Sequence, residues 1–247
     1  MVLVYVEAER GGTGVDLELT LERKDRIEPL TFTYQRMVNA GYVGRNQAEV
    51  RRHIEELAKK GIPGPKTTPT LYPVIPRALL TDAEIEVYSG ETSGEVEYVL
   101  LVEDERRIYV GLGSDHTDRH LEEADIPRSK QICPNVLSRK VWPLEEVTDH
   151  WDDLVMRSRV VSSGQEVLYQ EARLALILGP DELMTFVRSK IPGSLNGTVI
   201  YSGTVGMLTD GFVHGERFEA ELVDEMLNRR LELAYEVRPL DYLAMDE

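Results

Sequence analysis

Three carboxylate residues of this chain are spaced so that they could meet at one end of a β-sheet and bind a metal ion. Glu95 and Glu97 stand two residues apart at the start of a long apolar run, and Asp115 stands where the next apolar run gives way to polar residues. Side chains alternate between the two faces of a strand, so Glu95 and Glu97 project from the same face. If the two runs pair, all three carboxylates can lie together, and hard divalent cations prefer such oxygen ligands. We therefore predict a metal site formed by these residues.

Two neighbouring strands must position these carboxylates. Residues 95–102 read E-V-E-Y-V-L-L-V, residues 108–112 read I-Y-V-G-L, and the charged residues 103–107 separate them. Short, nearly uninterrupted apolar runs bounded by polar turns are typical of buried strands. We expect the two runs to be adjacent strands of one sheet.

A predicted helix over residues 46–60 carries a second candidate group, His53 and Glu56. Asn46 is a suitable N-cap, and Gly61 follows the last turn as a C-terminal signal. Residues three apart share one face of a helix, and a carboxylate that orients a histidine makes it a better general base. A solvated histidine on an exposed helix fits the same pattern. The alternative carboxylate partners on this helix are Glu49 and Glu55.

Short strands dominate the remainder of the chain. Residues 15–22 alternate between aliphatic and polar side chains, which indicates a strand with one buried face. Further strands are expected at 2–7, 30–34, 85–87, 198–202, 217–223 and 231–237, and helices at 118–124 and 181–190. The segments 151–159 and 166–178 fit either a strand or a helix. Many strands with few helices predict an α+β, mainly β, fold of the sandwich, barrel or roll type.

A segment rich in proline divides the chain. Prolines at positions 63, 65, 69, 73 and 76 exclude a helix or a central strand over residues 62–76. The segment is the best candidate for a boundary, with residues 1–75 on one side and 76–247 on the other, or for a loop packed over the core.

Composition excludes several classes of partner. The net charge of −16 argues against nucleic acid, which needs a basic surface, and against anionic membranes. No run of about 18 apolar residues is present, so no membrane-spanning helix is expected. The single cysteine, Cys133, excludes an internal disulfide and favours a reducing, cytoplasmic location.

Four motifs, in order, resemble those of the fumarylacetoacetate hydrolase superfamily. Residues 94–101 read G-E-V-E-Y-V-L-L and residues 113–122 read G-S-D-H-T-D-R-H-L-E. Lys130 precedes Cys133-Pro134, and residues 201–207 read Y-S-G-T-V-G-M. Each motif is weak alone, but their shared order is fairly specific, and the resemblance extends roughly from Gly44 to Val237. It is strongest to a prokaryotic branch of that superfamily known only as a domain of unknown function.

The resemblance assigns roles to residues. It implies a mixed β-sandwich roll, with Glu95, Glu97 and Asp115 as ligands of Mg²⁺ or Mn²⁺. It also implies a lid helix that carries a His-x-x-Glu dyad, which His53 and Glu56 match. The proposed division then separates N-terminal strands and this lid helix from a catalytic β-roll.

Three further residues receive implied roles in binding the substrate. Thr204 would contact it through its hydroxyl or its backbone, and Lys130 would bind one of its oxygen atoms. Arg119 matches the arginine of the second motif. A surface lysine fits Lys130 equally well, since the family's lysine lies further from Cys-Pro than three residues. A structural ion pair fits Arg119 at least as well as a role in binding.

The expected activity is hydrolysis of a carbon–carbon bond in a small oxo-carboxylic, acylpyruvate-like acid, with a divalent metal as Lewis acid. Decarboxylation, hydration or tautomerisation of a 2-oxo acid on the same fold is the alternative among enzymes. A catalytically silent metal-binding module is the alternative outside them. The resemblance also implies a homodimer, because strand-rich rolls have edges to protect.

Overall fold

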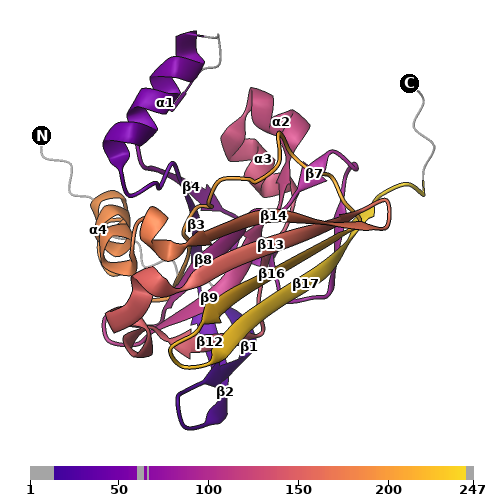
Figure 1. Cartoon of the computed structure of the whole chain (residues 1–247). Coiled ribbons are helices and arrows are strands. Elements are labelled where there is room, and N and C mark those ends of the chain that lie inside the picture. The colour runs from indigo at the N-terminus through magenta and orange to yellow at the C-terminus, as the bar shows by residue number, and fades with distance from the viewer. Residues whose placement is uncertain (1–13, 60–63, 66, 243–247) are drawn as a thin grey trace, which may run out of the picture.

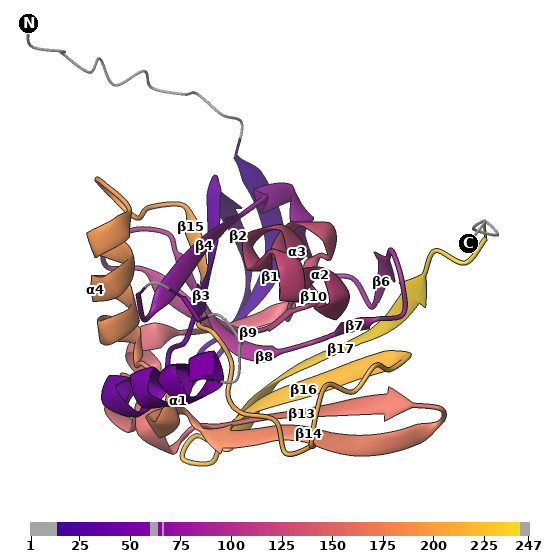
Figure 2. The ribbon, with the colours of Figure 1, turned by 90° about the horizontal axis from the view of Figure 1, so that it is seen from above.

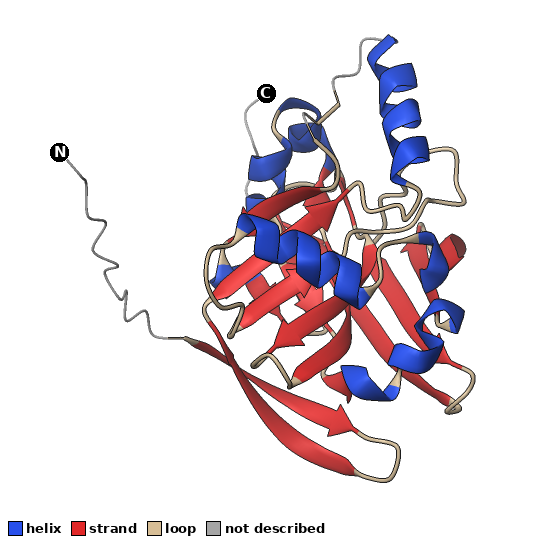
Figure 3. Ribbon diagram, turned by 90° about the vertical axis from the view of Figure 1, so that its left-hand side faces the viewer, coloured by secondary structure: helices blue, strands red, loops and turns tan. Residues whose placement is uncertain are grey.

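The structure of the protein is a computed structural model that describes residues 14–59, 64–65 and 67–242 (Figure 1). Strands are its main secondary structure, and most of them form two packed sheets (Figures 1 and 3). In the described residues, no helix is long and apolar enough to cross a membrane.

The strands, in chain order, are β1 (Val15–Glu22), β2 (Ile27–Tyr34), β3 (Arg36–Gly41), β4 (Thr70–Val74), β5 (Leu79–Leu80), β6 (Glu84–Val87), β7 (Thr92–Ser93), β8 (Val96–Val102), β9 (Ile108–Asp115), β10 (Thr117–Asp118), β11 (Asn135–Leu137), β12 (Lys140–Pro143), β13 (Val155–Ser162), β14 (Gln165–Arg173), β15 (Thr198–Tyr201), β16 (Arg217–Asp224) and β17 (Arg229–Pro239). The α-helices are α1 (Gln47–Lys59), α2 (Arg119–Ala124), α3 (Ile126–Ile132) and α4 (Pro180–Lys190). Short 3-10 helices occupy Pro76–Ala78, Leu144–Glu146, Thr148–Asp153 and Leu174–Leu176.

The larger sheet has ten strands, and its centre positions the carboxylates. Its order is β2-β1-β12-β9-β8-β15-β3-β4, with β11 beside β9 and β5 beside β11. β8 and β9 are antiparallel neighbours, as the two apolar runs predict, and β8 is buried along its whole length. Strands from both sides of residue 75 share this sheet. The division of the chain at that residue stays a prediction.

The smaller sheet has five strands in the order β14-β13-β16-β17-β6 and packs against the centre of the larger one (Figure 2). β13 and β16 alternate between buried and half-buried residues, so one face of each is apolar. That face joins Tyr98 and Val110 of the larger sheet with Met156, Leu222 and Tyr235 in one core. The two layers confirm the predicted mainly β, α+β fold.

α1, α2 and α3 lie at the top of the view in Figure 1, and α4 lies at its left-hand side. α1 begins as expected: the Asn46 side chain accepts a hydrogen bond from the Glu49 amide at 3.2 Å. Asp118 and Asp125 cap α2 and α3 in the same way, each accepting from the amide three residues later. These caps fix both short helices beside the carboxyl end of β9.

Several elements differ from the sequence predictions. β3, β11, β12 and α3 were not predicted, and the expected strand over residues 2–7 lies outside the described residues. The two ambiguous segments contain β13 and β14. Within the proline-rich segment, β4 pairs with β3 alone at the end of the sheet, which agrees with the exclusion of a central strand.

Candidate metal centre and cavity

The structure brings Glu95, Glu97 and Asp115 together at the paired ends of β8 and β9. One carboxylate oxygen from each lies within 4.8 Å of the others. Glu97 is opposite Gly113 in the ladder, and the Asp115 amide donates to the Glu95 carbonyl at 3.1 Å. Strand alternation and antiparallel register therefore create the cluster, as the sequence predicts.

Two glycines allow the backbone to approach the cluster closely. A Cβ on Gly113 would lie 2.5 Å from the ring of Tyr201 and 2.6 Å from Val99. Gly203 follows β15 with φ +81°, a conformation that side-chain-bearing residues rarely adopt. In this turn the Gly203 amide donates to the Glu97 carboxylate at 2.7 Å. The turn thus gives Glu97 a neutral donor.

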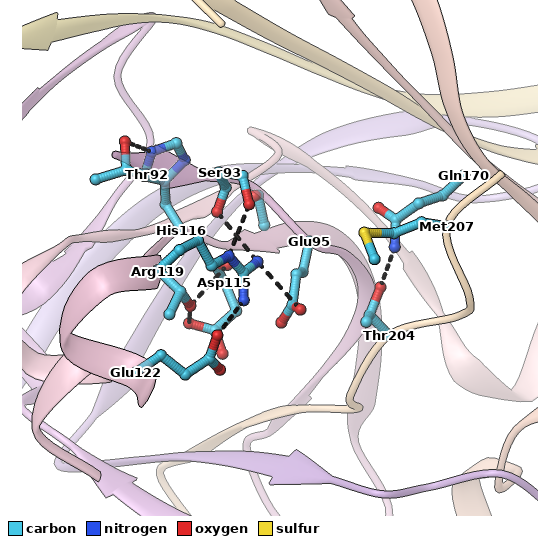
Figure 4. Close-up of polar contacts among 12 residues, drawn as sticks. Thr92, Ser93, Glu95, Asp115, His116, Arg119, Glu122, Gln170, Thr204 and Met207 are labelled. Carbon is cyan, nitrogen blue, oxygen red and sulfur yellow. Dashed lines mark hydrogen bonds and ion pairs between the residues drawn. The ribbon is translucent and has the colours of Figure 1, made fainter. Parts of the chain in front are cut away.

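Two cations neutralise the other carboxylates. Lys130 of α3 is about 5% exposed and forms an ion pair with Asp115. Arg119, the first residue of α2, lies 3.1 Å from Glu95 and 2.7 Å from Glu122 (Figure 4). Arg119 also donates to the Ser93 hydroxyl at 2.7 Å, so several groups hold it in place.

The pKa values follow from this pairing. Burial raises the pKa of Glu97 well above its usual range, and the charges of Asp115 and Glu95 raise it further. Burial acts on Glu95 too, but Arg119 and Lys130 outweigh it and lower its pKa. Burial opposes the charge of Lys130, yet Asp115 and Glu95 raise its pKa above the ordinary value.

These residues fit a hard divalent cation. Glu95 and Asp115 each have a positive partner, whereas the hydrogen bond that Glu97 accepts from Gly203 carries no charge. A bound dication would supply the missing positive charge to Glu97 and take oxygen ligands from all three residues. The donor set of carboxylate oxygens suits Mg²⁺ or Mn²⁺ and not a soft metal.

Thr204 and the buried Gln170 form a second polar group beside the cluster. The Thr204 hydroxyl donates to the Val96 carbonyl and accepts from Gln170 Nε2, both at 2.7 Å (Figure 4). Gln170 Nε2 also donates to the Val205 carbonyl at 2.9 Å, and its Oε1 accepts from the Val96 amide at 3.0 Å. Gln170 of β14 thus ties the turn after β15 to the start of β8.

A cavity of about 640 Å³ opens above these groups. Its inner part is lined by Glu95, Glu97, Lys130, Gln170 and Thr204. Val50 and Ile54 of α1 also line it, so this helix borders the cavity as a lid helix would. A groove of similar volume, about 650 Å³, runs along β3 and β4, but no carboxylate is among the described residues that line it.

The predicted general base cannot be placed in the same detail. His53 and Glu56 belong to α1, but their side chains lie outside the described part of the structure. Their pairing stays a prediction.

Sequence reasoning missed three side chains of this site: Gln170, Glu122 and Phe212. Each lines the cavity, and the Arg119 guanidinium lies 4.1 Å from the centre of the Phe212 ring. Glu122 is the last residue of the motif at 113–122, but its pairing with Arg119 depends on the turn of α2. Gln170 and Phe212 come from distant segments that carry no local signal.

His116 and Cys133 are buried near the cluster for other reasons. The ring of His116 bonds the hydroxyls of Tyr235 and Thr92, both at 2.9 Å. Burial lowers the pKa of His116 to about 3, and burial raises the pKa of the Cys133 thiol to about 12. A neutral histidine and a protonated thiol fit packing roles.

Comparisons with known proteins place the chain in a family. A family described as "Protein of unknown function (DUF2848)" matches residues 40–235. No curated protein matches the chain.

Solved structures share its fold at low identity. 2-Keto-3-deoxy-D-arabinonate dehydratase complexed with magnesium and 2,5-dioxopentanoate is 15% identical with a TM-score of 0.60, over 83% of this chain and 73% of that chain. A fumarylacetoacetate hydrolase family protein from Yersinia pestis CO92 is 16% identical with a TM-score of 0.54, over 83% of this chain and 94% of that chain. 4-Oxalocrotonate decarboxylase from Pseudomonas putida G7, complexed with calcium and acetate, is 14% identical with a TM-score of 0.51, over 81% of this chain and 76% of that chain.

Such identities establish a common architecture, while the family match covers most of the chain. The chain therefore belongs to the DUF2848 family, and it has the fold of the fumarylacetoacetate hydrolase superfamily.

Proposed function

We propose that this protein is a divalent-metal-dependent enzyme that hydrolyses a carbon–carbon bond in a small acylpyruvate-like oxo acid. The observation that carries the proposal is the cluster of Glu95, Glu97 and Asp115, with one oxygen from each within 4.8 Å of the others, of which Glu95 and Glu97 line a cavity of about 640 Å³. The structurally similar dehydratase was solved with magnesium and 2,5-dioxopentanoate, and the decarboxylase with calcium and acetate. Both of those ligand sets pair a hard cation with carboxylate or carbonyl oxygens.

Glu95, Glu97 and Asp115 would hold Mg²⁺ or Mn²⁺, which when bound supplies Lewis-acid stabilisation of negative charge that develops on substrate oxygens. Without a metal the site would disfavour an anionic substrate, because Glu122 adds a fourth carboxylate while, among the described residues, these carboxylates pair with two cations, Lys130 and Arg119. A divalent ion cancels that excess. Substrate binding should therefore require metal.

Lys130 and the turn after β15 would position the substrate. Lys130 lines the cavity, and its ammonium has donors left after pairing with Asp115. The Thr204 hydroxyl already donates its proton to the Val96 carbonyl. Of the two modes expected for Thr204, contact through the backbone is therefore the one that we propose.

α1 would supply the general base. Val50 and Ile54 line the cavity. Position 53 is three residues after Val50 and directly before Ile54 on the same helix. In the proposed reaction, His53, oriented by Glu56, accepts a proton from water as the water oxygen bonds to the distal carbonyl carbon. The bond from that carbon to the neighbouring methylene then breaks, and the methylene carbon receives a proton. The products are a carboxylic acid and a shorter 2-oxo acid.

A decarboxylase, hydratase or tautomerase is the second candidate. The dehydratase and the decarboxylase among the similar structures carry such reactions on the same fold. These reactions need no water attack at a distal carbonyl, so products distinguish them from hydrolysis. A metal-binding module without activity is the third candidate.

A screen of 2-oxo and 2,4-dioxo acids with added Mn²⁺ or Mg²⁺ tests the proposal. Hydrolysis of a 2,4-dioxo acid to two acids, lost with chelator and lost in the Glu97→Gln variant, would support it. Carbon dioxide release, or double-bond movement without cleavage, would assign the second candidate. Tight metal binding with no turnover of any acid would favour the silent module.

A further inference from the structure

The cavity above the carboxylates has two chemically different parts. Glu97, Lys130 and Gln170 lie deep, at 1%, 5% and 0% exposure, whereas Glu95 and Glu122 are half-buried. The outer wall is mostly apolar and comes from three separate segments of the chain. Its residues are Val50, Ile54, Ile126, Met207 and Phe212.

The outermost wall is unusually apolar for a surface. Met207 is 38% exposed and Phe212 is 45% exposed, and both face the cavity from the segment that follows the turn at Gly203. Water-exposed aromatic and thioether groups beside a cavity are typical of a wall that a ligand covers. The polar floor would bind the oxo-acid end of a substrate, so these residues would contact its opposite end.

Charge on the outer wall disfavours a second anionic group. Among the described residues that line the cavity, the one cation is Lys130, and it pairs with Asp115 at the floor. Glu122 also lines the cavity and shares Arg119 with Glu95. A distal carboxylate would therefore lose its hydration against hydrocarbon groups and approach Glu122, while Arg119, behind the Phe212 ring, is already paired with Glu95 and Glu122.

We infer that the site selects oxo acids whose end remote from the carboxylate is an uncharged hydrocarbon group, and that Phe212 and Val50 enforce this selection. The inference rests on the proposed function, since it assumes that the floor binds the oxo-acid end. Each methylene buried against the outer wall should tighten binding about fourfold.

Calorimetric titration of the Mn²⁺-loaded full chain tests the inference with matched ligands. 5-Methyl-2-oxohexanoate has the shape of 2-oxoglutarate, with two methyl groups in place of the oxygens of the second carboxylate. It should bind at least about tenfold more tightly than 2-oxoglutarate. 2-Oxohexanoate should bind at least about tenfold more tightly than 2-oxobutanoate. Equal or tighter binding of 2-oxoglutarate, or no dependence on chain length, would overturn the inference.

Oxalate separates this inference from the proposed function, because it offers two adjacent carboxylate groups and no tail. Oxalate binding without any preference among the tails would overturn the inference alone. If neither oxalate nor any of the oxo acids binds to the Mn²⁺-loaded chain, the proposed function and the inference both fall.

Variants then locate the selectivity on the wall. Phe212→Ala and Val50→Ala should each reduce the preference for 2-oxohexanoate over 2-oxobutanoate, measured as a ratio within each variant, by about threefold or more. Leu208→Ala is the matched control, because Leu208 is 57% exposed on the same segment and does not line the cavity. A preference that survives both wall variants, or falls equally in the control, contradicts the assignment of selectivity to this wall.

Discussion

Replacing Thr204 with valine tests whether its hydroxyl holds the protein together or binds the substrate. Valine keeps the shape of threonine but removes the hydroxyl. The variant loses two hydrogen bonds of 2.7 Å, one to the Val96 carbonyl and one from Gln170 Nε2. In the variant, the Val96 carbonyl and Gln170 Nε2 face a methyl group instead of the hydroxyl.

The expected loss follows from those two bonds. A buried hydrogen bond contributes about 1 kcal/mol net, and a partner left unpaired adds to the cost. Gln170 Nε2 keeps its bond to the Val205 carbonyl, which limits the damage on that side. We expect the free energy of unfolding to fall by about 2–3 kcal/mol for Thr204→Val and by less than about 1 kcal/mol for Thr204→Ser, which keeps the hydroxyl.

Urea unfolding of the metal-free variants measures this loss as a shift of the midpoint at constant slope. Oxalate affinity of the Mn²⁺-loaded variants is the second measurement, and it should fall less for serine than for valine. A Thr204→Val variant with wild-type stability and greatly reduced oxalate affinity would refute the reasoning, because the hydroxyl would then serve the ligand.

Three further predictions concern the base, the buried carboxylate and the assembly. His53→Ala should lower the single-turnover rate on the substrate found in the screen by about 10²–10⁴-fold and abolish the acid limb of the pH–rate profile. Glu56→Gln should lower the rate by less. A wild-type rate in His53→Ala would mean that this face of the helix is ordinary solvent-exposed surface. Folding raises the pKa of Glu97, so the folded protein keeps the proton on this carboxyl at pH values where the unfolded chain has lost it. The free energy of unfolding of the metal-free wild type should therefore fall relative to that of Glu97→Gln as pH rises from about 5 to 8. Urea unfolding that gives the same difference between the two proteins at every pH would contradict this. The chain should sediment at equilibrium as a dimer, and a species of 28.0 kDa alone would reject that expectation.

The centre of the site was predictable because its signals are local. Glu95 and Glu97 flank one residue at the start of β8, and Asp115 ends β9, so strand period and pairing suffice to bring them together. The alternation in β1 and the cap at Asn46 are local signals of the same kind. The carboxylate cluster and the start of helix α1 therefore follow from local spacing.

The remainder depends on long-range packing. β3 pairs with β15 and β4, and its residues Met37–Ala40 are all buried. Its sequence therefore lacks the alternation of apolar and polar residues that would predict a strand. α3 has start signals in Asp125 and Pro127, but seven residues are too few for an apolar stripe. Gln170 reaches Val96 and Thr204 because two sheets pack face to face, which no spacing in the sequence indicates.

Manganese binding by Glu97→Gln tests the central claim most directly. Calorimetric titration of the wild type should show one Mn²⁺ site per chain, and Glu86→Gln, at an exposed carboxylate of β6, should match it. Mutating a group behind a metal ligand already costs about 10–100-fold in affinity, so removing a ligand charge should cost about 100-fold or more. A Glu97→Gln variant that binds Mn²⁺ as tightly as the wild type would contradict the metal centre on which the proposed function depends.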